Sequence, residues 1–246
     1  MLRQKIEGIE EKTEIVILPE MFTTGFSMKP ELFSETMAGE TMQWMKRIAA
    51  EKKIILTGSV IIEDPSANAQ DGKFFNRLIW MLPNGEYGVY DKRHLFAFAN
   101  EHQHYSSGNK KLIASVKGWK INLQICYDLR FPVWARQDFQ SENKYDLLIN
   151  VANWPEKRNI AWQTLLRARA IENQCFVVGV NRTGEDGNES YYSGDSTIID
   201  PLGEIIYQKN KEEDVFTYTL QKEKINETRN QFPFLKDADS FIIKDL

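Results

Sequence analysis

The sequence predicts an α/β fold with mixed sheets, and three observations lead to that prediction. Short apolar runs typical of buried strands recur along the 246 residues. Between some of these runs lie segments with apolar residues at helical spacing. Two turn signatures separate strand-like runs that follow each other directly, which indicates antiparallel hairpins beside the α/β alternation. A sheet with both kinds of connection has parallel and antiparallel neighbours.

The individual elements follow from composition and periodicity. Strand-like runs occupy residues 14–19, 53–62, 76–82, 119–126, 145–153 and 175–181. Helices are predicted over 39–53 and 160–174, and the first of these ends in basic residues, as the helix dipole favours. Strands and helices therefore alternate through most of the chain.

Turn residues mark two hairpins. Asn84-Gly85 lies between two β-like runs, which is the strongest short-range hairpin signal. The segment 198–206 reads as strand, turn and strand, with Pro201 and Gly203 in the turn. Residues 91–110 and 181–195 lack clean periodicity and are expected to be long loops, which in compact domains are usually functional or mobile.

Composition favours an ordinary globular protein with one large domain over residues 1–246. Apolar residues make up 42% and charged residues 27%, and we find neither an internal repeat nor a convincing linker. The net charge is −4 without a basic block, so nothing recommends nucleic acid as a partner. No apolar run reaches the roughly 20 residues that span a bilayer, and no membrane partner is expected.

The cysteines and the first residues indicate a reducing compartment. Two cysteines do not make a disulfide framework in a chain of this length. The first residues are charged and lack the apolar core of a secretory signal. A cytoplasmic location is therefore expected, where a free thiol persists as a reagent.

Three predicted strands each end in a potentially reactive side chain. Glu20 follows the first strand, Lys92 follows the second strand of the Asn84-Gly85 hairpin, and Cys126 ends the run 119–126. Functional sites in α/β proteins tend to assemble at strand ends. These three side chains are the candidate catalytic residues.

The chemistry of the three groups is coherent. A thiol with an ordinary pKa of about 8.5 is only a few per cent thiolate at neutral pH. A carboxylate can take its proton as a general base, and an ammonium group can favour the thiolate and later an oxyanion. If Cys126 opens a short helix, the backbone N–H of Tyr127 is a natural second oxyanion donor.

The segments around these residues resemble a known family. LPEMFTTGFSM around Glu20, YDKRHLF around Lys92 and ICYDLRFP around Cys126 are similar, in the same order, to the three signature segments of the nitrilase superfamily. The resemblance continues through NVANWPEKR and LLRARAIENQ to NRTG and YSGDSTIIDPLGE, and so covers nearly the whole chain.

The resemblance implies both a fold and a reaction. Members of the superfamily form a four-layer α-β-β-α sandwich and hydrolyse or condense C–N bonds through a Glu-Lys-Cys triad and a cysteine thioester. A second glutamate in the loop after the lysine positions the lysine, and Glu101 matches it. No cofactor is implied, and a metal site is not expected at His94, His102 and His104 because no partner lies at zinc-finger spacing.

The amino-acid sequences of the motifs most resemble those of the omega-amidase branch, which hydrolyses the terminal amide of 2-oxoacid amides such as 2-oxoglutaramate. Such a small anionic substrate needs a cationic or N–H-rich clamp. Arg130 is either that clamp or a structural ion-pair partner, and both readings stay open. Phe26 and Trp154 are further candidates for substrate binding, with core packing as the alternative. Cys175 has no motif residues of this kind around it in the sequence, and it is expected in the core.

Three further expectations concern assembly, the chain start and competing functions. The helix over 160–174 contributes to a homodimer interface in the superfamily, so a homodimer or a higher homo-oligomer is implied. The first residues resemble the middle of the superfamily's first helix, so its first N-terminal strand is expected to be missing. The alternatives are hydrolysis of another C–N substrate, such as an N-carbamoyl amino acid or a nitrile, and a catalytically silent scaffold.

Overall fold

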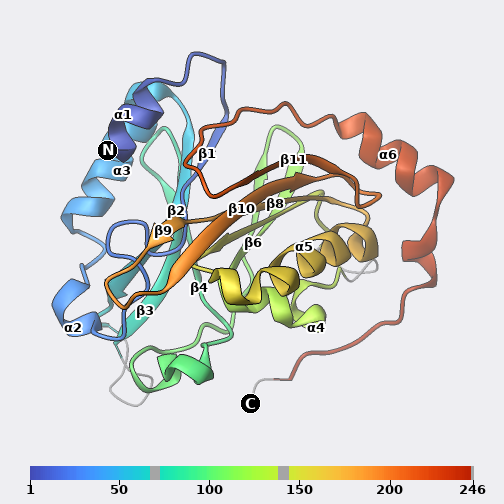
Figure 1. The fold of residues 1–246 in the computed structure, drawn as a ribbon. Helices are drawn as coiled ribbons and strands as arrows, with labels where there is room; N and C mark the ends of the chain where they lie inside the picture. The colour runs from blue at the N-terminus through green and yellow to red at the C-terminus, as the bar shows by residue number, and fades with distance from the viewer. Residues whose placement is uncertain (67–72, 138–143, 245–246) are drawn as a thin grey trace. The chain divides into compact units, whose positions relative to one another are not determined.

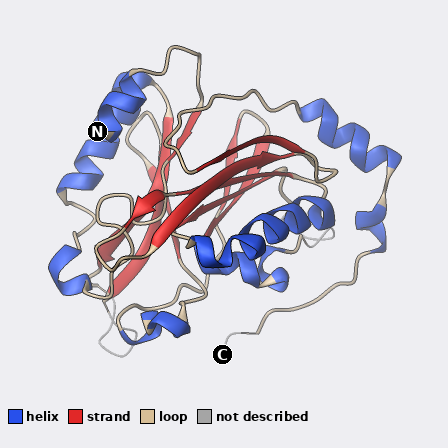
Figure 2. Ribbon diagram, viewed as in Figure 1, coloured by secondary structure: helices blue, strands red, loops and turns tan. Residues whose placement is uncertain are grey.

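The computed structural model describes residues 1–66, 73–137 and 144–244 (Figure 1). The chain divides into two compact units. Unit 1 comprises residues 1–110 and 214–217, and unit 2 comprises residues 111–213 and 218–246. Each unit contains a mixed β-sheet and its own helices (Figure 2).

The sheet of unit 1 has four strands in chain order. They are β1 (Ile15–Ile17), β2 (Ile55–Glu63), β3 (Phe74–Met81) and β4 (Tyr87–Asp91). β1 and β2 are parallel, whereas β2 with β3 and β3 with β4 are antiparallel. The turn from β3 to β4 contains Gly85 at φ +85°, where the absence of Cβ removes the steric penalty, so the predicted hairpin is confirmed.

One long helix of unit 1 lies between β1 and β2 in the chain. α3 (Glu40–Lys52) buries Met45, Ile48 and Ala49 in a cluster with Leu56 of β2. The shorter helical segments of this unit are α1 (Leu2–Glu7), α2 (Pro30–Phe33), η1 (Ala97–Ala99) and η2 (Glu101–Gln103). The last two lie in the predicted loop 91–110, which is therefore partly 3₁₀-helical.

The sheet of unit 2 has parallel strands in the middle and antiparallel strands at both edges. Its strands are β5 (Ile113–Val116), β6 (Trp119–Ile125), β7 (Leu147–Ala152), β8 (Phe176–Asn181), β10 (Tyr191–Ile199) and β11 (Ile205–Asn210). Their order is β11-β10-β8-β7-β6-β5, with β6, β7 and β8 parallel. The short strand β9 (Thr183–Glu185) pairs with β10.

The main helix of unit 2 covers one face of this sheet. α5 (Asn159–Asn173) buries Trp162 and Leu166 against sheet residues that include Val177. A Cβ at Gly179 of β8 would lie only 2.5 Å from the Leu166 side chain, so the close approach of α5 requires glycine there. The remaining helical segments are η3 (Cys126–Arg130), α4 (Pro132–Ala135), η4 (Glu156–Arg158), α6 (Lys222–Gln231) and η5 (Phe234–Asp237).

The prediction of an α/β fold with mixed sheets is confirmed, and its six strands and two helices are present with shifted ends. The prediction of a loop over 181–195 is wrong, because β9 and the start of β10 form a hairpin there. Asp186 holds its turn by accepting the N–H groups of Asn188 and Ser190. The single-domain prediction stays a prediction. Over the residues described, the helices include none long and apolar enough to cross a membrane.

Candidate active site

Glu20 lies just beyond β1, on a backbone that β2 holds in place. The parallel pairing continues past the strand, since the Leu18 N–H donates to the Thr57 carbonyl at 2.7 Å. Met21 adopts a left-handed backbone conformation (φ 42°), and its N–H donates to Ser59 Oγ at 2.8 Å. The Glu20 side chain is consequently fixed in the interior, with a relative exposure of 1%.

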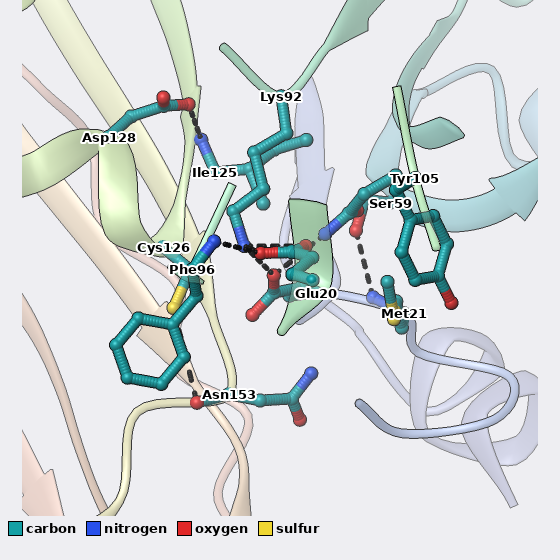
Figure 3. A network of polar contacts seen from close by, with 12 residues as sticks. Glu20, Met21, Ser59, Lys92, Phe96, Tyr105, Ile125, Cys126, Asp128 and Asn153 are labelled. Atoms are coloured by element: carbon teal, nitrogen blue, oxygen red, sulfur yellow. Dashed lines mark hydrogen bonds and ion pairs between the residues drawn. The ribbon is translucent and has the colours of Figure 1, made fainter. Parts of the chain in front are cut away.

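Lys92 follows β4 and reaches the Glu20 carboxylate (Figure 3). Its Nζ donates to Glu20 Oε1 at 3.0 Å. Asn76 of β3 serves both residues, because its carbonyl accepts the Lys92 N–H at 3.0 Å and its Nδ2 donates to Glu20 Oε1 at 2.8 Å. The hairpin therefore fixes the carboxylate and the ammonium group together.

Glu101, at the start of η2, binds the other side of the ammonium group. Its two carboxylate oxygens lie 3.0 and 2.9 Å from Lys92 Nζ, and Oε2 also accepts the Phe96 N–H at 2.5 Å. Burial raises the pKa of Glu101, the neighbouring charge of Glu20 raises it further, and Lys92 opposes the shift. The predicted link between Glu101 and Lys92 is present in the structure.

Two aromatic residues of unit 1 lie close to this group. The Phe26 ring centroid is 5.3 Å from Lys92 Nζ, a cation–π distance, and the ring is half-buried. Tyr105 is buried and donates its hydroxyl to the Ser27 carbonyl at 2.5 Å. Burial raises the pKa of Tyr105, so the phenol is neutral and acts as a fixed hydrogen-bond donor.

Cys126 comes directly after β6, at the first position of η3. It has a φ of 44°, which is rare for a residue with a Cβ and marks a sharp turn between strand and helix. Asp128 is buried and stabilises this turn by accepting the Ile125 N–H at 3.1 Å. Cys126 is partly exposed as a residue, which is compatible with the sequence prediction of a presented cysteine.

Residues after β7 lie beside Cys126 within unit 2. The Cys126 thiol donates to the Asn153 carbonyl, with Sγ 4.0 Å from the oxygen. The Arg130 guanidinium lies 4.8 Å from the centroid of the Trp154 ring, which is itself buried beside Trp162. Among the described residues, Arg130 makes this contact with Trp154, and its role as clamp or as structural partner stays a prediction.

Cys175 and the histidines have surroundings of a different kind. Cys175 is completely buried after α5, and burial raises the pKa of its thiol, so the prediction of a core cysteine is confirmed. His102 is exposed, while His94 and His104 are half-buried. Within the described ranges, we find no group of three or more histidine, cysteine or acidic side chains arranged to hold a metal ion.

Four polar residues that organise these positions were not predicted from the sequence. They are Ser59 and Asn76 in unit 1, and Asn153 and Asn181 in unit 2. Asn76 and Asn181 share one signal in the sequence, which is an asparagine inside or at the end of a largely apolar strand. Such a residue needs buried hydrogen-bond partners to lie in a strand.

Comparison with known proteins identifies the family. The family model described as carbon-nitrogen hydrolase matches residues 3–230. The chain belongs to the carbon-nitrogen hydrolase family. This match includes Glu20, Lys92, Glu101 and Cys126, and it confirms the predicted nitrilase superfamily.

Individual relatives lead to the same placement. The omega-amidase YafV of Escherichia coli K12 is 42% identical over 239 residues, which are 97% of this chain and 89% of the relative. The 2-oxoglutaramate amidase of Bacillus subtilis is 32% identical, with 98% and 89% covered. The chain therefore falls in the omega-amidase branch, and it is a hydrolase of C–N bonds.

A solved structure shares the fold over almost the entire chain. It is XC1258 from Xanthomonas campestris, a CN-hydrolase superfamily protein described with an arsenic adduct in the active site. It is 44% identical, with a TM-score of 0.94, and the alignment covers 99% of this chain and 91% of that protein. The predicted nitrilase-type α/β sandwich is confirmed.

Proposed function

We propose that this protein hydrolyses the terminal amide of a small 2-oxo dicarboxylic acid monoamide, such as 2-oxoglutaramate, to the acid and ammonia. Relatives named omega-amidase and 2-oxoglutaramate amidase, which align with nearly the whole chain, support this substrate class. The buried Glu20, Lys92 and Glu101 and the turn at Cys126 support the reaction.

In the first half of the proposed reaction, the Glu20 carboxylate accepts the thiol proton of Cys126. The sulfur attacks the amide carbonyl carbon, and the C=O electron pair moves to the oxygen. Lys92 Nζ and the Tyr127 N–H stabilise this oxyanion. When the C–N bond breaks, the nitrogen takes the proton from Glu20 and leaves as ammonia, so that a thioester on Cys126 remains.

In the second half, Glu20 deprotonates a water molecule, which attacks the thioester carbonyl. The C–S bond breaks, the acid is released, and the proton on Glu20 returns to the sulfur. A single carboxylate thus acts as base and acid in both halves. Glu101 has the separate role of holding the Lys92 ammonium group, which its two oxygens contact.

We assign recognition of the distal carboxylate to Arg130. Its guanidinium is stacked on the buried Trp154 ring, an arrangement that leaves its edge N–H groups available for a bidentate carboxylate. Trp154 is buried and donates through Nε1 to the Arg158 carbonyl at 2.8 Å, which supports its role as the ring on which the Arg130 guanidinium packs. Phe26 is proposed to shape the substrate site next to Lys92.

The observation that carries the proposal is the conformation of Cys126, a partly exposed residue on a left-handed turn in a chain of the omega-amidase branch. The test is ammonia release from 2-oxoglutaramate, with glutamine, an N-carbamoyl amino acid and a nitrile as comparison substrates. We expect a kcat/KM for the 2-oxo amide at least about 100-fold above that for glutamine, because contacts in the substrate pocket determine which substrate is hydrolysed. Preference for another substrate would refute the omega-amidase assignment.

We also propose a homo-oligomer and a cytoplasmic location. Ile160 and Ile171 of α5 are exposed, and Leu202 is exposed in the turn that touches Ile171. Exposed apolar residues on a helix and on the turn beside it are typical of protein interfaces. Two free cysteines are consistent with a reducing compartment. Light scattering coupled to size exclusion tests the assembly, and a monomer at micromolar concentration would contradict it.

A further inference from the structure

We propose that Asn181 is a positioning residue that aims the Asn153 carbonyl at the Cys126 thiol. The inference rests on the proposed function, in which Cys126 is the nucleophile. Asn181 is the last residue of β8, it is buried, and all its contacts considered below lie within unit 2.

The side chain of Asn181 forms hydrogen bonds with both the N–H and the carbonyl of Trp154. Oδ1 accepts the Trp154 N–H at 2.8 Å, and Nδ2 donates to the Trp154 carbonyl at 2.9 Å. Nδ2 also donates to the Gly194 carbonyl on β10 at 2.7 Å. These contacts use both polar atoms of the amide, so the side chain has one defined orientation.

The geometry of the peptide unit between Asn153 and Trp154 links these hydrogen bonds to the Cys126 thiol. The Trp154 N–H and the Asn153 carbonyl belong to the same planar peptide, in which a trans bond makes N–H and C=O point in opposite directions. Asn181 holds the N–H, so the carbonyl points away from Asn181. The thiol of Cys126 lies on that side and donates to this oxygen, with a sulfur–oxygen distance of 4.0 Å (Figure 3).

Asn181 itself is anchored independently of its side chain. Its N–H donates to Ser196 Oγ at 3.0 Å, and the same hydroxyl donates to the Asn181 carbonyl at 3.1 Å. The cross-strand partner of Asn181 is Ala152, which precedes Asn153. The orientation of the thiol acceptor therefore depends on the strand order β10-β8-β7 and on one asparagine side chain.

The proposed effect is on attack and not on substrate affinity. The thiol that donates to the Asn153 carbonyl has a defined rotamer before Glu20 takes its proton. The Trp154 ring has separate anchors, which are Trp162 at 5.5 Å and the Arg158 carbonyl. Loss of the Asn181 amide therefore frees the peptide while the ring under Arg130 keeps its contacts.

The first test compares Asn181→Leu with Thr197→Val. Thr197 of β10 is buried and donates its hydroxyl to the Tyr207 carbonyl, so the control also removes a buried hydrogen bond but touches neither Trp154 nor Cys126. We expect Asn181→Leu to lower kcat for 2-oxoglutaramate at least about tenfold with KM changed less than about threefold, as loss of an attack geometry does. Thr197→Val is expected to keep kcat within about twofold. A kcat in Asn181→Leu within twofold of wild type, or an equal loss in the control, would overturn the inference.

The second test needs no turnover. The S–H stretching band of Cys126, obtained as the infrared difference between each protein and its Cys126→Ala counterpart, reports the hydrogen bond to Asn153. We expect the band to shift to higher frequency in Asn181→Leu and to stay in place in Thr197→Val. Asn181→Ser, whose hydroxyl is too short to bridge both Trp154 atoms, takes the place of the leucine variant if that variant lacks a cooperative thermal transition. An unshifted band overturns the inference, whereas a wild-type protein inactive on every amide refutes the proposed function and leaves this test intact.

Discussion

At the scale of single residues, the arrangement of charge around Lys92 controls the site. Two buried carboxyl groups contact one ammonium group at this point. Burial and the charge of Glu20 raise the pKa of Glu101, which means that its ionised form is costly in the folded state. Lys92 offsets this cost and is thereby held in one position.

The raised pKa of Glu101 predicts a pH dependence of stability. The folded state keeps the Glu101 proton to higher pH than the unfolded state, whose carboxyl has a pKa of about 4.3. The stabilisation is therefore complete below that value and is lost as the pH rises through the pKa of the folded state. Glu101→Gln should remove this loss, so that its Tm relative to wild type increases with pH in this window. Scanning calorimetry across pH measures it, and Glu227→Gln, an exposed glutamate of α6, is the control. A Tm difference that is constant with pH would contradict the prediction.

Arg130 provides a prediction about substrate affinity. Arg130→Met keeps an apolar stem over Trp154 and removes the guanidinium, so KM for 2-oxoglutaramate should rise at least about tenfold with kcat within about threefold, because a charged hydrogen bond contributes about 1.5–3 kcal/mol. Arg182→Met is a matched control, since Arg182 stacks at the same 4.8 Å distance on Tyr192. Unchanged steady-state kinetics in Arg130→Met would show that the carboxylate binds elsewhere.

Prediction from sequence at this scale was limited by distance along the chain. Glu20, Lys92 and Cys126 stand out because each follows a strand-like run within a characteristic motif. Asn76 acts on Glu20, which is 56 positions away, and Asn181 acts on Trp154, 27 positions away. Such roles depend on strand pairing, which residue types alone do not specify.

At the scale of elements, close packing of β1 on β2 sets the position of Glu20. Gly58 of β2 lies under the segment that leaves β1, where a Cβ would come within 2.8 Å of Leu18 Cβ and 2.9 Å of the Phe22 ring. A side chain at this position would push that segment away from the sheet. Glycine is therefore required by contact with the segment that carries Glu20.

Gly58→Ala is predicted to lower both stability and activity. Overpacking of this kind costs about 1–3 kcal/mol, and each kcal/mol lowers Tm by about 2–4 °C for a chain of this size. The expected result is a Tm several degrees lower and a reduced kcat, as measured by calorimetry and ammonia release. Gly187→Ala should leave both unchanged, because no atom lies within 4 Å of a Cβ there. Equal effects of the two substitutions would contradict this account of β1.

Elements were predictable where hydrophobic pattern and turn chemistry agreed. The β3–β4 hairpin follows from Asn84-Gly85, and α3 and α5 follow from apolar residues at helical spacing. The hairpin over 181–195 was missed because its strand β9 has only three residues, which include a glycine and have no apolar side chain. Its register comes from pairing with β10 and from the turn at Asp186.

At the scale of the whole molecule, the chain distributes the chemistry between its two units. Unit 1 carries the buried charged group of Glu20, Lys92 and Glu101, and unit 2 carries the thiol of Cys126. Each unit carries its groups at the ends of strands in a mixed sheet, where the backbone leaves the ladder. The family match over residues 3–230 includes these groups from both units.

The proposed function depends on Cys126 as the nucleophile of a 2-oxo amide hydrolase. The most direct measurement is the rate of ammonia release from 2-oxoglutaramate by the wild type, Cys126→Ala and Cys175→Ala, each verified as folded by its thermal transition. We expect turnover by the wild type and by Cys175→Ala, and a loss of at least about 10³-fold in Cys126→Ala, as removal of a covalent nucleophile causes. Turnover that survives in Cys126→Ala would show that Cys126 is not the nucleophile.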